Sequence, residues 1–337
     1  MSHKHRLLYV PILLGGLAAG LGLLPGCESF NDSVGSLLAG LGLGPAAKVE
    51  QVEVCGPGQK EVLDPLTLPE HSPGVRVARD LVYARLPGVK VSLNSLDLYL
   101  PESGYCHPVV VFIHGGGWLG GDKRHVDQKP EAFVRRGYIL ASVNYRLSPA
   151  VRHPEHVKDV ARALKFIRDN AARYRGDPTE IFLLGHSAGA HLAALVATDE
   201  RYLEAVGLSL RVIRGVVLLD GAGYDLPLQM TMTGGPLFDQ IYHMAFGGDP
   251  QRWRDASPSA HVVAHKGIPP FLLFHLGPRQ ATGVQAGKFA EVLTKAEVPV
   301  EDQFAQGVSH AALNSRLGQA GDMPTQKTFQ FLTALRY

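Results

Sequence analysis

Residues 181–189 read Ile-Phe-Leu-Leu-Gly-His-Ser-Ala-Gly, the most informative local pattern in the chain. Its apolar residues predict a strand covered on both faces, and the alanine-rich residues that follow predict a helix. Gly-x-Ser-x-Gly between a strand and a helix forms a sharp turn, the elbow (residues 185–189), which exposes the serine hydroxyl. Ser187 is therefore predicted to be a nucleophile, with the N–H of Ala188 and the helix start facing the reacting carbonyl. The alternative is an ordinary strand-to-helix turn.

Strands and helices alternate around the elbow. Apolar runs predict further buried strands at residues 109–113, 139–143, 212–219 and 271–274. A further strand is expected at 298–304. Helical spacing of apolar side chains predicts helices at about 157–171, 284–296 and 325–335. Alternating apolar and polar residues predict antiparallel strands at 89–94 and 96–100. The pattern predicts one α/β domain with a mostly parallel central sheet, helices on both faces, and a site at the carboxyl ends of the strands.

A second signal is the glycine loop (residues 114–118), which reads His-Gly-Gly-Gly-Trp after the first of the buried strands. Glycines allow the backbone to approach a substrate closely and to present N–H groups to a developing oxyanion. Gly116 and Gly117, together with Ala188, are predicted to be those donors. Trp118 is expected either to line the substrate pocket or to belong to the core. A loop without a ligand is the alternative.

Charge and composition exclude several classes of protein. The chain carries 33 basic and 31 acidic residues, and 45% of its residues are hydrophobic. Such a near-neutral balance gives no indication of nucleic-acid binding, and the apolar share excludes a disordered chain. Histidines recur at close spacing, but no acidic or cysteine partner completes a ligand set for a metal. We therefore expect no metal, no cofactor and no nucleic-acid partner.

The N-terminal region predicts export. Basic side chains precede an uncharged apolar run at residues 7–24, as in a secretory signal. The run is soon followed by Cys27 in a context that resembles a bacterial lipobox, which implies a lipid anchor in the cell envelope, facing the periplasm or the cell surface. The expected organisation is a lipoprotein signal peptide at 1–26, a tether at 27–74 and the α/β domain at 75–337. A transmembrane anchor of the same length is the alternative.

Two cysteines remain, Cys55 and Cys106. Because exported proteins fold in an oxidising compartment, the pair is predicted to form one disulfide. Two unpaired thiols are the alternative.

The motifs together resemble the α/β-hydrolase carboxylesterases of the hormone-sensitive-lipase and kynurenine-formamidase type, from about residue 76 to 337. The resemblance rests on the elbow, on the glycine loop, and on Asn-Tyr-Arg-Leu-Ser-Pro at 144–149, which is similar to the family's Asp-Tyr-Arg-Leu-Ala-Pro. It implies an α/β-hydrolase fold and, at His310 before the final helix, the catalytic base. Histidine suits that role because it titrates near neutral pH.

The third catalytic group departs from this family. Relatives carry an acid shortly after the strand that matches residues 271–275, whereas residues 277–283 of this chain contain no Asp or Glu. Asp220, at the end of the preceding strand, is the predicted substitute. Asp225 is the rival, and a site without an acid is the third possibility.

These residues predict a serine carboxylesterase that hydrolyses a small-molecule ester through an acyl-enzyme. The alternatives are an arylformamidase-type amide hydrolase and a non-catalytic binding or envelope protein on a degraded hydrolase fold. An apolar, methionine-containing segment at 227–253 is expected either to cover an acyl or aryl group or to pack as helices without touching substrate.

Overall fold

The computed structural model describes residues 74–232, 235–277 and 281–336. The predicted signal peptide, the lipidation site Cys27, the tether and Cys55 lie outside these ranges. Cys106 is buried at the end of the loop before β3, and its pairing with Cys55 stays a prediction. Within the described ranges, no helix is both long enough and apolar enough to cross a membrane.

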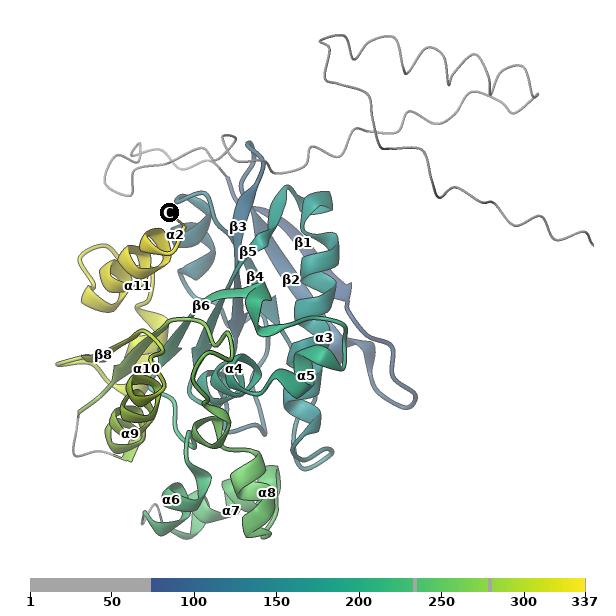
Figure 1. Ribbon diagram of the computed structural model, residues 1–337. Helices are drawn as coiled ribbons and strands as arrows, with labels where there is room; N and C mark the ends of the chain where they lie inside the picture. The colour runs from purple at the N-terminus through teal and green to yellow at the C-terminus, as the bar shows by residue number, and fades with distance from the viewer. Residues whose placement is uncertain (1–73, 233–234, 278–280, 337) are drawn as a thin grey trace, which may run out of the picture. The chain divides into compact units, whose positions relative to one another are not determined.

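An eight-stranded sheet with the order β1-β2-β4-β3-β5-β6-β7-β8 forms the centre of the domain (Figure 1). β1 and β2 are antiparallel to their neighbours, and the pairs from β4 to β8 are parallel. The strands are β1 Arg76–Val82, β2 Ser95–Leu100, β3 His107–Ile113, β4 Ile139–Val143, β5 Gly176–His186, β6 Ile213–Leu219, β7 Phe271–His275 and β8 Val300–Phe304. The predicted α/β-hydrolase architecture is confirmed.

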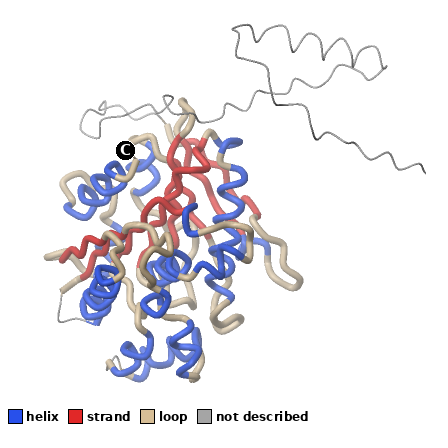
Figure 2. The backbone as a smooth tube through the Cα atoms, in the orientation of Figure 1, coloured by secondary structure: helices blue, strands red, loops and turns tan. Residues whose placement is uncertain are grey.

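Helices cover both faces of the sheet, as Figure 2 shows by colour. The described helices are α2 Lys129–Val134, α3 Glu155–Asn170, α4 Ala188–Thr198, α5 Glu200–Glu204, α6 Leu226–Thr231, α7 Pro236–Phe246, α8 Pro250–Asp255, α9 Ala281–Lys295, α10 His310–Ser315 and α11 Met323–Ala334. The apolar segment at 227–253 forms most of α6, α7 and α8, and these three helices lie together at one end of the domain (Figure 1).

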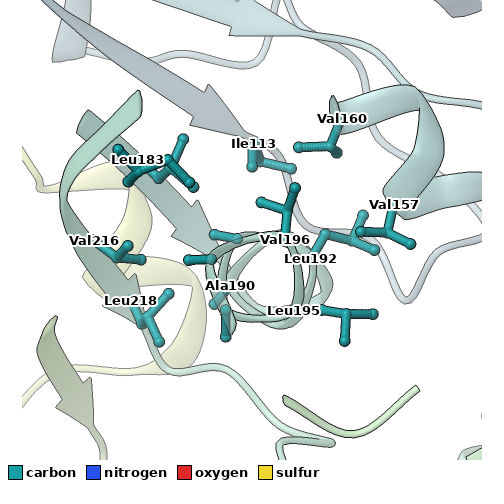
Figure 3. Close-up of a cluster of buried hydrophobic side chains, with 14 of the residues drawn as sticks. Ile113, Val157, Val160, Leu183, Ala190, Leu192, Leu195, Val196, Val216 and Leu218 are labelled. Atoms are coloured by element: carbon teal, nitrogen blue, oxygen red, sulfur yellow. The ribbon is translucent and has the colours of Figure 1, made fainter. Parts of the chain in front are cut away.

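Two apolar cores lie on opposite faces of the sheet, because successive side chains of a strand point to opposite sides. Val111 and Ile113 of β3 point to the core made with α3, α4 and α9, the first core. Figure 3 shows Ile113 and residues of α3, α4, β5 and β6 within it. Val110 and Phe112 point to the second core, with α2, α10 and α11.

One predicted strand is wrong. Residues 89–94 contain a 3-10 helix, Val91–Asn94, and Val91 is 45% exposed. Pro87 and Gly88 form a turn closed by a hydrogen bond from Val89 N to Leu86 O, so the alternation there reflects a surface turn. The first strand is instead β1, an edge strand whose charged side chains hid it from the apolar pattern.

Candidate active site

The elbow places Ser187 between β5 and α4. Its backbone has φ 54° and ψ −121°, a conformation that residues other than glycine rarely adopt. Glycine is required on both sides of it. A Cβ on Gly185 would lie 2.4 Å from the carbonyl oxygen of Gly189, and a Cβ on Gly189 would lie 2.0 Å from that of Ile113. The two glycines thus allow strand and helix to cross closely, and the strained backbone at Ser187 is typical of a nucleophile elbow.

His310 and Asp220 meet at the same edge of the sheet. His310 is the first residue of α10, and its Nδ1 lies 2.6 Å from Asp220 Oδ2. Asp220 directly follows β6, has φ 45°, and is 1% exposed. With Nδ1–H donating to the carboxylate, the Nε2 atom of His310 remains available to accept a proton.

Asp225, the other candidate acid, caps a helix. The Asp225 side chain accepts a hydrogen bond from Leu228 N at 3.0 Å and so caps the start of α6. Its backbone N–H donates to Gln285 Oε1. Of the two candidate carboxylates, Asp220 is the one that contacts His310.

The glycine loop lies against the elbow. A Cβ on Gly115 would lie 3.0 Å from Ser187 Cβ, and a Cβ on Gly116 would lie 2.2 Å from the carbonyl oxygen of Gly120. Within the described residues, no hydrogen bond uses the N–H of Gly116, Gly117 or Ala188. These three backbone N–H groups therefore have no hydrogen-bond acceptor among the described residues.

Aromatic side chains pack against both ends of the glycine loop. The His114 ring stacks on Tyr145 with centroids 4.5 Å apart, and Tyr145 donates a hydrogen bond to His114 O. Trp118 is 3% exposed and packs on Phe246 with centroids 4.8 Å apart. Of its two expected roles, the structure places Trp118 in the core beneath α7, away from an open surface.

His186 contacts His310, and the sequence did not predict this contact. The His186 ring lies 4.5 Å from the His310 ring, and His186 Nε2 lies 3.1 Å from His310 O. Burial lowers the pKa of His186 to about 3, and the neighbouring His310 is the second cause of this shift. His186 is therefore neutral near pH 7, and its Nε2–H can donate to that carbonyl. Its place inside the elbow was the only sequence signal.

Lys129 holds the other end of α10. Its side chain is fully buried, and its Nζ donates to Asn314 O at 2.8 Å. Burial lowers the pKa of Lys129 to about 8, against the opposing attraction of Asp127, whose carboxylate lies 3.7 Å away. The helix that begins at His310 is thus bound near both ends. No sequence pattern distinguishes Lys129 from an exposed lysine.

His275 occupies the end of β7, after which the family resemblance predicts an acid. Its Nε2 lies 3.6 Å from Asp302 Oδ1 on β8, and its Nδ1 accepts a hydrogen bond from Gly277 N. Burial raises the pKa of the Asp302 carboxyl. Across the described ranges, no three His, Cys, Asp or Glu side chains gather in a way that could hold a metal ion.

Sheet, elbow and glycine loop together define an α/β-hydrolase. The BD-FAE family model matches residues 96–211. The probable isoprenylcysteine alpha-carbonyl methylesterase ICMEL1 of Arabidopsis thaliana is 31% identical, over 72% of this chain and 52% of its own length. The probable carboxylic ester hydrolase LipM of Mycobacterium tuberculosis is 30% identical, over 76% of this chain and 62% of its own. The chain spans about half the length of the first of these curated relatives.

Solved structures of esterases share this fold. A carbohydrate esterase from gut microbiota superimposes with a TM-score of 0.66 at 19% identity, covering 80% of this chain and 99% of that one. A thermophilic esterase of Thermogutta terrifontis, in its butyrate-bound form, has a TM-score of 0.58 at 26% identity, covering 78% and 93%. The chain therefore has the α/β-hydrolase fold, and it is similar in sequence to esterases.

Proposed function

We propose that this protein is a serine carboxylesterase. Ser187 attacks the acyl carbon of the ester while His310 Nε2 takes the hydroxyl proton, and the N–H groups of Gly116, Gly117 and Ala188 receive the negative charge on the carbonyl oxygen. His310 then returns the proton to the departing alcohol. Water, activated by the same imidazole, releases the acid from Ser187 and restores the enzyme.

The hydrogen bond between His310 and Asp220 is the observation that carries this proposal. Within the described residues, Asp220 Oδ1 has no hydrogen-bond partner, so the histidine is the one donor to a carboxylate that is 1% exposed. A buried carboxylate with so few donors is costly as a structural element. As the partner of an imidazole that becomes charged in each catalytic cycle, it has a clear purpose.

The proposal is tested with the full-length protein in detergent. Turnover of p-nitrophenyl butyrate is measured for the wild type and for Ser187→Ala, because the Thermogutta relative was solved with butyrate bound. Removing the nucleophile of such a site lowers kcat by about 10⁵-fold or more, and covalent labelling by a fluorophosphonate should disappear with it.

The same assay separates the alternatives. A wild type that hydrolyses a formanilide but none of a series of esters would favour the arylformamidase-type reaction. A wild type that turns over neither class and is not labelled at Ser187 would overturn catalysis altogether and favour a binding protein. Circular dichroism shows whether Ser187→Ala is folded.

A further inference from the structure

Helix α7 lies directly on the glycine loop. Two of its buried side chains, Tyr242 and Phe246, pack on Trp118 with ring centroids 5.4 and 4.8 Å away. On an adjacent stripe, Ile241 reaches the loop itself, because a Cβ on Gly117 would lie 3.2 Å from Ile241 Cγ2. The helix is therefore fixed beside one of the proposed oxyanion donors.

The stripe that begins at Ile241 continues outward as exposed apolar surface. Leu237 and Phe238 precede Ile241 by four and three positions, so the three lie on one side of the helix. Leu237 is 72% exposed and Phe238 is 46% exposed, in a protein that buries most of its large apolar side chains. An apolar surface next to a polar reaction centre is typical of a ligand-binding site. We refer to Leu237, Phe238 and Ile241 as the α7 row.

The position of His310 decides which part of an ester the α7 row can contact. The helix that carries His310 packs through Leu313 into the second core, whereas α7 packs through Tyr242 and Phe246 into the first core. The two elements thus approach the elbow from opposite faces of the sheet. Since the alcohol must leave beside His310 to receive its proton, the acyl group extends toward α7.

We infer that the α7 row is the binding subsite for the acyl chain, and that the substrates are esters of extended apolar carboxylic acids. The inference rests on the proposed function and names its substrate class. One helical turn, about 6 Å along the axis, separates Ile241 from Leu237. An acetyl group placed beside Ile241 cannot reach the outer residues, whereas an octanoyl chain can. Each methylene that becomes buried there should raise kcat/KM by about fourfold.

The test measures kcat/KM for p-nitrophenyl acetate, butyrate, hexanoate and octanoate, which share one leaving group. The full-length wild type is compared with the double variant Leu237→Ser, Phe238→Ser and with Tyr105→Ser, which changes an aromatic side chain of similar exposure in the loop before β3. We expect the double variant to lower the octanoate-to-acetate ratio of kcat/KM by about tenfold or more, and Tyr105→Ser to leave the ratio unchanged. Both altered side chains are exposed, and thermal unfolding checks that the variants are folded.

Each other outcome is decisive. An unchanged ratio in the double variant overturns the inference, and so does an equal fall for all four esters. Sensitivity to the chain length of the alcohol in a series of alkyl acetates, without sensitivity to acyl length, would assign the α7 row to the leaving group and overturn the acyl assignment. A wild type that hydrolyses no ester would overturn the proposed function itself, which distinguishes the two failures.

Discussion

The ends of β6 and β7 are two neighbouring positions for the proposed catalytic acid, and different side chains occupy them in this protein. At the end of β6, Asp220 is buried and accepts the hydrogen bond from His310. At the end of β7, after which the family resemblance predicts the acid, His275 faces Asp302 of β8 instead. The two strands are adjacent and parallel, so both of their carboxyl ends open on the same edge of the sheet.

Contact with His310, rather than position on a fixed strand, therefore distinguishes the carboxylate that we propose as the catalytic acid. Asp220 begins its loop with a positive φ of 45°, and its backbone N–H donates to Phe274 O on β7. The carboxylate is thereby held between the two strands, within reach of α10. Asp302 lies in β8 itself and is engaged with His275.

Asp220→Asn should have the largest effect among these strand-end residues. An amide can no longer stabilise the imidazolium or hold the productive tautomer of His310, so kcat should fall by about 10⁴-fold with little change in KM. Steady-state hydrolysis of p-nitrophenyl butyrate measures both constants. Asp225→Asn is the matched control and should retain nearly full activity. A strong loss in the control with a mild loss in Asp220→Asn would reverse the comparison.

His186→Gln should have an intermediate effect, because it removes the ring beneath His310. A displacement of the base of about 1 Å can cost about 10²-fold in rate, so kcat should fall by about 10- to 100-fold. The same variant alters acid stability. The pKa of His186 is about 3 in the folded protein against an ordinary 6.5, so below pH 6.5 the unfolded state binds more protons. The free energy of unfolding of the wild type must then decrease from pH 6.5 toward pH 3.

Relative to wild type, His186→Gln should remove about 3 kcal/mol of this pH dependence between pH 7 and pH 4. Urea unfolding at pH 7, 5 and 4 measures the difference, with the exposed His125→Gln as control. If the two proteins lose stability in parallel as the pH falls, His186 does not carry the effect.

Asp302→Asn should have the smallest effect. The carboxylate is partly exposed and contacts His275 rather than His310, so kcat should change by less than about threefold. Comparison of pH–rate profiles for the variant and the wild type is the sharpest check. A shift of the acidic limb would mean that the end of β7 still communicates with the base.

Much of the fold and part of the candidate site could be predicted from the sequence by itself. The elbow, the glycine loop and the buried strands are local patterns, and local backbone sterics specify them. Gly185 and Gly189 are glycines because carbonyl oxygens lie where their Cβ atoms would be. The 3-10 turn at Val91–Asn94 escaped prediction because a short alternation of apolar residues occurs in turns as well as in strands.

The tertiary structure alone decided which distant groups meet. Asp220 and His310 are 90 residues apart, and Lys129 and Asn314 are 185 apart. Sequence reasoning left Asp220, Asp225 and no acid open, because the reach of each carboxylate depends on the loop after β6 and on the position of α10. It also left open whether the segment at 227–253 could contact substrate, which depends on how α7 packs against the glycine loop. Such contacts follow from the packing of whole elements across the sheet, which no local pattern encodes.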